Sequence, residues 1–138
     1  MKDIAYLALG SNIGQREVFL AQGRKGIGQL PGTRILGETE VEETAPLGPI
    51  PQEPFLNQMI AIETELSPHE LLEEIHRIEA EAGRVRDVRW GPRTLDIDIV
   101  LFERQSVNEP DLTVPHPELA NRSFWLSELA TLRGASVE

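Results

Sequence analysis

Residues 89–102 read RWGPRTLDIDIVLF, and this stretch places two carboxylates in a strand that is otherwise apolar. The period-two alternation over residues 95–102 predicts a β-strand with two distinct faces. One face is expected to hold Leu95, Ile97, Ile99 and Leu101, and the other Asp96, Asp98, Val100 and Phe102. At a rise of about 3.3 Å per residue, same-face neighbours lie roughly 7 Å apart, so Asp96 and Asp98 converge on one small volume. Because two partly buried carboxylates repel each other, a divalent cation is expected beside them.

Four arginines precede this strand within ten residues, interrupted by a single acid; they are Arg84, Arg86, Arg89 and Arg93. Such a cluster attracts anions, and the planar guanidinium binds phosphate oxygens in pairs. Mg²⁺ is commonly held by one or two carboxylates together with substrate phosphates, and phosphoryl transfer depends mainly on positioning and charge neutralisation. The sequence therefore predicts a Mg²⁺ and polyphosphate site in which Arg84 and Arg93 clamp the phosphates. A solvated charged loop is the alternative for the arginines.

The composition restricts the class of protein. With 138 residues and 40% hydrophobic content, the chain is expected to form a single domain spanning residues 1–138. A net charge of −10 argues against a general nucleic-acid binder or a membrane-surface protein, and the apolar runs are too short for a membrane span. The absence of cysteine excludes disulfides and thiolate metal sites and fits a reducing cytoplasm, where we expect the protein.

The remaining hydrophobic patterns predict a mixture of strands and helices. Strands are expected over residues 4–9, 34–43, 56–66 and 112–114, and helices over about 15–30, 68–82 and 124–132. The clearest helix start is Ser67-Pro68-His69-Glu70, a capping box with proline at the first helical position. The last helix is expected to turn Phe124, Leu126, Leu129 and Leu132 inward. This order is typical of an α+β ferredoxin-like sandwich, an antiparallel sheet with helices packed on one face.

Several side chains offer contacts to a flat heterocycle. Asn57 opens a strand just after a proline-rich loop at residues 44–54, and its amide has a donor and an acceptor for a ring edge. Phe55 and Phe124 offer stacking surfaces, and Trp90 stands where a large aromatic would cover something flat. Core packing is the more common use of such rings.

Two further residues are candidates for phosphate contacts. His116 and Arg122 follow the short strand at residues 112–114 and add contacts to a triphosphate if the fold brings them near. A structural histidine is the alternative for His116. The turn at residues 10–14, Gly-Ser-Asn-Ile-Gly, lacks the spacing of nucleotide-binding glycine motifs, and we interpret it as a strand exit and helix cap.

Five segments, taken together, carry a resemblance to a known family. They are Leu9-Gly10-Ser11-Asn12, Thr44-Ala45-Pro46-Leu47-Gly48, Phe55-Leu56-Asn57, residues 89–102, and Val114-Pro115-His116-Pro117 with Arg122. They resemble the 6-hydroxymethyl-7,8-dihydropterin pyrophosphokinases of folate biosynthesis, and residues 89–98 are the most specific part. The resemblance implies a ferredoxin-like fold, a monomer, and transfer of the β,γ-diphosphate of ATP to the pterin hydroxymethyl oxygen with release of AMP.

The resemblance also implies roles for individual residues at matching positions. Asp96 and Asp98 would hold two Mg²⁺ ions, and Arg84 and Arg93 would neutralise charge that develops during transfer. The pterin would contact a set of residues that read its edge, stack on it or close over it, namely Thr44, Leu47, Phe55, Asn57, Trp90 and Phe124. The ATP nucleotide would contact Glu79, Trp90, Arg93, Ile99, Thr113, His116 and Arg122.

This chain departs from the family pattern at two positions that bear on the site. Phe55 replaces a tyrosine of some members, which keeps the stacking surface. Asp111 stands where some members place a basic nucleotide contact, which bears on ATP affinity. A non-catalytic pterin- or nucleotide-binding module is the main alternative function, but the intact set of Arg84, Arg93 and the aspartate pair favours an enzyme. A structural calcium site would need more oxygen ligands than this strand offers.

Overall fold

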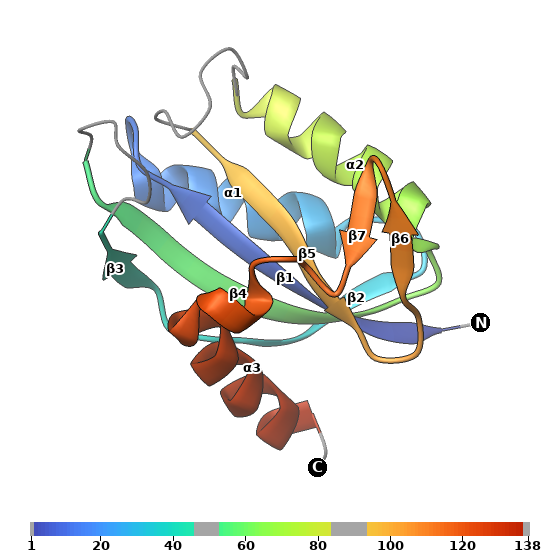
Figure 1. The fold of residues 1–138 in the computed structure, drawn as a ribbon. Helices are drawn as coiled ribbons and strands as arrows, with labels where there is room; N and C mark the ends of the chain where they lie inside the picture. Colours follow the sequence, from blue (N-terminus) through green and yellow to red (C-terminus); the bar gives the residue numbers. More distant parts are fainter. Residues whose placement is uncertain (1, 46–52, 84–93, 137–138) are drawn as a thin grey trace.

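A computed structural model of the chain describes residues 2–45, 53–83 and 94–136 (Figure 1). Its main sheet contains β2 (Thr33–Glu38), β4 (Phe55–Thr64), β1 (Asp3–Ser11) and β5 (Asp96–Phe102) in that spatial order, and β3 (Glu42–Thr44) pairs with β4 as well. All of these pairings are antiparallel. β5 is therefore an edge strand, and its outer side is available to other groups.

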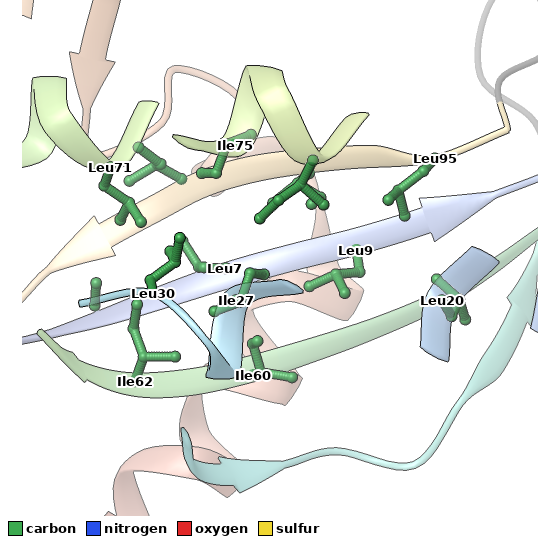
Figure 2. Packing of buried hydrophobic residues seen from close by; sticks show 14 of the residues in the cluster. Leu7, Leu9, Leu20, Ile27, Leu30, Ile60, Ile62, Leu71, Ile75 and Leu95 are labelled. Carbon is green, nitrogen blue, oxygen red and sulfur yellow. The ribbon is translucent and has the colours of Figure 1, made fainter. Parts of the chain in front are cut away.

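One face of the sheet is covered by α1 (Arg16–Gly28) and α2 (Pro68–Glu81). Figure 2 shows this core, in which Leu7 and Leu9 of β1 meet Ile27 of α1 and Ile75 of α2. The tight packing explains why α1 contains glycines that disfavour a helix. A Cβ at Gly23 would lie 3.0 Å from Leu9 Cδ2, so a side chain there would push α1 away from the sheet.

The other face is covered by α3 (Ser123–Ser136), as Figure 1 also shows. Its buried stripe consists of Trp125, Leu129 and Leu132, which pack on alternate residues of β1 and β4. The predicted α+β ferredoxin-like fold is confirmed, with α1 and α2 sharing one face and α3 adding a layer on the opposite one. The prediction that Leu126 faces inward was wrong: it is 48% exposed, because the spacing from Trp125 to Leu129 and Leu132 defines the buried stripe.

The start of α2 follows the capping-box prediction. Ser67 Oγ accepts a hydrogen bond from the Glu70 backbone N–H at 3.2 Å, and Glu70 Oε1 accepts one from the Ser67 N–H at 2.8 Å. The helix ends near Gly83, whose φ of +80° is a conformation that glycine adopts without strain. The C-terminal turn of α2 meets β5, where Glu79 contacts the backbone of Ile97, the residue between the two aspartates.

β5 contains a β-bulge, and the predicted alternation fails there. Tyr6 pairs with Leu101 and the next residue of β1, Leu7, pairs with Ile99, so Val100 is the extra residue. Phe102 consequently joins the α1/α2 core, while Leu101 packs on the α3 side; the predicted faces of these two residues were wrong. A single inserted position reverses every later side chain along a strand.

A small hairpin stands beside the edge of β5. It consists of β6 (Val107–Glu109) and β7 (Leu112–Val114), which pair antiparallel, and a short 3-10 helix, η1 (Leu119–Asn121), follows it. The bulge joins the two parts, because the Val100 carbonyl accepts a hydrogen bond from the His116 backbone N–H at 2.8 Å. Among the described residues no helix has the length and apolarity that crossing a membrane requires.

Candidate functional site

Asp96 and Asp98 lie together at the outer edge of the sheet. Both side chains are half-buried, and both line a cavity of about 290 Å³ between the C-terminal part of α2, β5 and the segment after β7. The same cavity is lined by four other residues singled out from the sequence, Glu79, Ile99, Thr113 and His116. Six predicted site residues from three separate chain segments therefore meet at one place.

The electrostatics of the cavity favour a cation. Burial raises the pKa of the Asp98 carboxyl well above its usual range, Asp96 raises it further by charge repulsion and a hydrogen bond, and Glu79 acts in the same direction. Arg122 offsets part of this effect. The donor set consists of carboxylate oxygens, which are the ligands that Mg²⁺ prefers. The residues present therefore fit a hard divalent cation, and a bound cation would stabilise their ionised form.

His116 is held as a neutral hydrogen-bond donor toward the cavity. Its Nδ1 accepts a hydrogen bond from the Glu118 backbone N–H at 3.0 Å, which assigns the ring proton to Nε2. Nε2 lies 3.8 Å from Asp98 Oδ1. Burial lowers the pKa of His116, and the nearby positive charge of Arg122 lowers it as well, so the neutral imidazole is favoured.

Trp125 supports both His116 and Arg122, and sequence reasoning missed it. The His116 ring meets the indole edge-on with centroids 4.9 Å apart, and the Arg122 guanidinium lies over the indole at 4.4 Å. Arg122 Nε is buried and has no hydrogen-bond partner within the described ranges 2–45, 53–83 and 94–136. The sequence does show a tryptophan three residues after Arg122. However, only the orientation of α3 on the sheet determines that this side chain faces inward.

Glu79 contacts the backbone of the aspartate strand. Its side chain is 2% exposed, and Oε2 accepts a hydrogen bond from the Ile97 N–H at 2.8 Å. Ile97 stands between the two aspartates in the chain. The resemblance implies that Glu79 contacts the nucleotide. In the structure, one of its carboxylate oxygens is already hydrogen-bonded to the backbone of β5.

A second group of predicted residues lies on the α3 face of the sheet, in the strands next to the aspartates. Asn57 of β4 is opposite Gly10 of β1, and Gly10 is opposite Asp96 of β5, so these three residues form one row across the sheet with side chains on one face. A Cβ at Gly10 would lie 3.2 Å from Asn57 Oδ1 and 3.4 Å from the Phe55 ring. A side chain at position 10 would therefore crowd the amide and the ring, and glycine avoids that contact.

The amide of Asn57 has a fixed orientation. Its Nδ2 donates a hydrogen bond to Thr44 Oγ1 of the neighbouring strand β3, which leaves Oδ1 on the side of Gly10. Phe124, half-buried at the start of α3, packs edge-on against Trp125 with centroids 6.2 Å apart. The predicted residues Leu47, Arg84, Trp90 and Arg93 lie outside the described residues.

The rim of the cavity is acidic where the hairpin turns. Asp111 lines the cavity and its side chain is 68% exposed. His69 at the start of α2 places Nε2 2.7 Å from Glu109 Oε1 and 3.6 Å from Asp111 Oδ1, which joins α2 to the hairpin.

Known proteins are similar to this chain over most of its length. The family model described as 7,8-dihydro-6-hydroxymethylpterin-pyrophosphokinase matches residues 6–134. The chain is 46% identical over 132 residues to the 2-amino-4-hydroxy-6-hydroxymethyldihydropteridine pyrophosphokinase of Bacillus subtilis, an overlap of 96% of this chain and 79% of the relative. The proteins of the same name from Methylorubrum extorquens and Pseudomonas aeruginosa are 44% and 43% identical; the overlaps cover 93% and 92% of this chain and 81% and 78% of the relatives.

Proposed function

We propose a function from one premise: the chain belongs to the 7,8-dihydro-6-hydroxymethylpterin-pyrophosphokinase family. Its reaction is the transfer of the β,γ-diphosphate of ATP to the hydroxymethyl group of 6-hydroxymethyl-7,8-dihydropterin, with release of AMP, in folate biosynthesis. The pterin oxygen attacks the β-phosphorus, and the bond from that phosphorus to the bridging oxygen of the α-phosphate breaks. ATP is the co-substrate, so the site must hold a polyphosphate and a pterin side by side.

The aspartate pair is the centre of the proposed site. Asp96 and Asp98 hold two Mg²⁺ ions, which supply the charge neutralisation that a polyphosphate needs in a partly buried cavity. The support for this assignment is the donor set and the raised pKa of Asp98, whose neighbours Asp96 and Glu79 are also acidic. Carboxylates kept this close serve no packing purpose, so a bound cation explains them best.

The nucleotide occupies the cavity along the edge of β5. The Ile97 N–H points outward to Glu79, and alternation along the strand turns the Ile99 N–H to the same side, where it is a backbone donor for the base. His116 offers Nε2–H to a phosphate oxygen, and Arg122 offers its buried Nε and positive charge. Thr113 lines the hairpin side. Arg84 and Arg93 complete the phosphate clamp, and Trp90 covers it.

The pterin lies on the α3 face beside the aspartates. Asn57 Oδ1 accepts from the amino-pyrimidinone edge, because Thr44 already holds the Nδ2 side of the amide. Gly10 adds no side chain to the row that leads from Asn57 to Asp96, so it does not press on the Asn57 amide or the Phe55 ring that contact the pterin. Phe55 and Phe124 stack on the ring, and the backbone groups of Thr44 and Leu47 read the rest of its edge. The reactive hydroxymethyl oxygen then faces the phosphates.

A single observation carries the assignment: two half-buried carboxylates and a neutral histidine donor line one cavity, with a stacked arginine beside Asp98. Purified protein with Mg²⁺, ATP and 6-hydroxymethyl-7,8-dihydropterin should produce AMP and the pterin diphosphate in equal amounts. Chromatographic separation of the nucleotides measures this directly. ADP as the product contradicts the proposal. Binding of both substrates with no AMP formed indicates the alternative, a non-catalytic binding module.

We also propose that residues 1–138 act as one domain and as a monomer in the cytoplasm, with no nucleic-acid partner. The support is the resemblance and the net charge of −10. Light scattering after size-exclusion chromatography tests the monomer, and cell fractionation tests the location. A dimer at micromolar concentration would contradict the first of these proposals.

A further inference from the structure

An edge strand that carries metal ligands needs something to fix its backbone. β1 holds only the inner side of β5. On the outer side, within the described residues, Glu79 Oε2 accepts a hydrogen bond from the Ile97 N–H at 2.8 Å, and the Val100 carbonyl accepts one from the His116 N–H at 2.8 Å. The first of these bonds falls between Asp96 and Asp98 in the chain. Its acceptor is therefore in the best position to determine how the two carboxylates are spaced.

We infer that Glu79 is a positioning residue that fixes the backbone between Asp96 and Asp98 and thereby sets the geometry of the metal-binding pair. This inference rests on the function proposed above and goes beyond it, since it gives Glu79 a role toward the aspartates in place of a direct contact with the nucleotide. The side chain is 2% exposed, which leaves little surface for a ligand to touch. Glu79 belongs to α2, and Ile75 and Ile78 of this helix pack in the core beneath the sheet, so the acceptor is held by a rigid element.

The position of the acceptor atom can matter without any direct contact with the ion. Groups that orient metal ligands from behind commonly change metal affinity 10- to 100-fold when they are removed. Glu79 contributes negative charge as well as an acceptor, and the two contributions are separable. Glu79→Gln keeps an oxygen at the same reach and removes the charge. Glu79→Asp keeps the charge and withdraws the oxygen by one methylene group.

The experiment compares these two variants in the full chain, with Mn²⁺ and α,β-methylene-ATP as probes. Bound Mn²⁺ is measured by electron paramagnetic resonance, and the exchange rate of the Ile97 amide hydrogen is measured by NMR without metal. We expect Glu79→Asp to weaken Mn²⁺ binding by about 10- to 100-fold and to speed Ile97 exchange. We expect Glu79→Gln to bind Mn²⁺ within about threefold of the parent protein and to keep the amide protected, because the amide oxygen accepts the same bond.

Glu73→Gln is the matched control, because Glu73 is an exposed glutamate on the same helix. It should change neither quantity. Equal loss of Mn²⁺ affinity in both Glu79 variants would overturn the inference, since the charge alone would then matter. Unchanged Mn²⁺ affinity in Glu79→Asp would overturn it as well. Circular dichroism identifies a variant that fails to fold, and the other variant then decides the question.

Failure of the proposed function gives a different result. In that case the parent protein itself binds no Mn²⁺ with the nucleotide and forms no AMP. Failure of the Glu79 inference leaves the parent protein active, with Mn²⁺ affinity either unchanged in Glu79→Asp or lost equally in both Glu79 variants.

Discussion

Two carboxylates enclosed by this fold, Asp98 on β5 and Glu128 on α3, have raised pKa values for different reasons. Glu128 is 8% exposed and accepts a hydrogen bond from Thr39 Oγ1 at 3.1 Å, and burial raises its pKa to about 7. Asp98 has two acidic neighbours in Asp96 and Glu79. Glu42 also raises the pKa of Glu128, but hydrogen bonds from the Thr39 hydroxyl and the Met59 backbone, both uncharged, offset part of the shift. At Asp98 the offset comes instead from the positive charge of Arg122. The kind of neighbour, more than the shift itself, therefore separates a candidate site from a structural residue.

The largest expected difference concerns activity. Asp98→Asn keeps the side-chain shape and removes the charge that we propose holds Mg²⁺, so we expect kcat to fall by about 10³-fold or more, which corresponds to roughly 4 kcal/mol. Metal-free stability should stay the same or rise, because repulsion from Asp96 is relieved. Glu128→Gln is the matched control and should keep kcat within about twofold. Steady-state assays of AMP release and urea unfolding measure both variants. Comparable loss of activity in the two variants would contradict the distinction between Asp98 as a site residue and Glu128 as a structural one.

A smaller effect is expected at the arginine that partly offsets Asp98. Arg122→Lys keeps the positive charge and loses the planar group that lies 4.4 Å from the Trp125 ring centroid. We expect kcat/KM for ATP to fall by about 10- to 100-fold, or roughly 1.4 to 2.7 kcal/mol, with little change in melting temperature. Full activity in this variant would show that charge alone is needed, and Arg122 would then act only as a counter-ion for Asp98.

Glu128 should control how stability depends on pH. Its folded-state pKa of about 7 lies above the ordinary value of 4.5, so the fold favours the protonated form. The free energy of unfolding should therefore fall as pH rises from about 4.5 to 7 and level off above that, by about 1 to 2 kcal/mol once partial access to water is allowed for. Urea unfolding of the parent protein and Glu128→Gln at pH 5 and pH 8 measures the difference. Identical pH dependence in the two proteins would rule out Glu128 as its source.

The smallest expected effect is confined to the pterin. Gly10→Ala places a methyl group 3.2 Å from Asn57 Oδ1 and 3.4 Å from the Phe55 ring, so those groups must shift by a few tenths of an ångström. We expect the pterin KM to rise about three- to tenfold, on the order of 1 kcal/mol, with the ATP KM unchanged. Gly37→Ala, a strand glycine whose added methyl makes an ordinary 3.5 Å contact with Leu132, is the control. A rise in the ATP KM alone would place Gly10 with the nucleotide instead.

Local sequence patterns predicted the parts of this molecule that depend on local interactions. The capping box at Ser67 and the alternation through Asp96, Ile97 and Asp98 involve neighbours in the chain, and the structure confirms both. The bulge at Val100 was not predictable, because it depends on how β5 pairs with β1, a strand some 90 residues away. The same limit applies to Leu126, whose exposure follows from how α3 lies on the sheet.

The candidate site shows the same division. Its charged residues were found because a carboxylate pair in an apolar strand contradicts local expectations, and the family resemblance added roles for His116 and Arg122. Two supporting contacts were missed. The hydrophobic pattern of α2 does not mark Glu79 as special, apart from its being a buried acid. Its hydrogen-bond partner is a backbone N–H eighteen residues away, which the local sequence does not reveal. Trp125 resembles an ordinary core residue until His116 is seen to pack against its edge.

The most decisive measurement locates the bound cation, because it tests whether the aspartate pair is the metal site. Crystals of the full chain grown with Mn²⁺ and α,β-methylene-ATP locate the ion by its anomalous scattering. We expect Mn²⁺ in contact with carboxylate oxygens of both Asp96 and Asp98, at about 2.0 to 2.3 Å, with the phosphates on its other side. An ion found only at the exposed cluster of His69, Glu109 and Asp111, whose ligand atoms lie within 4.8 Å of one another, would contradict the assignment of the aspartate pair as the metal site.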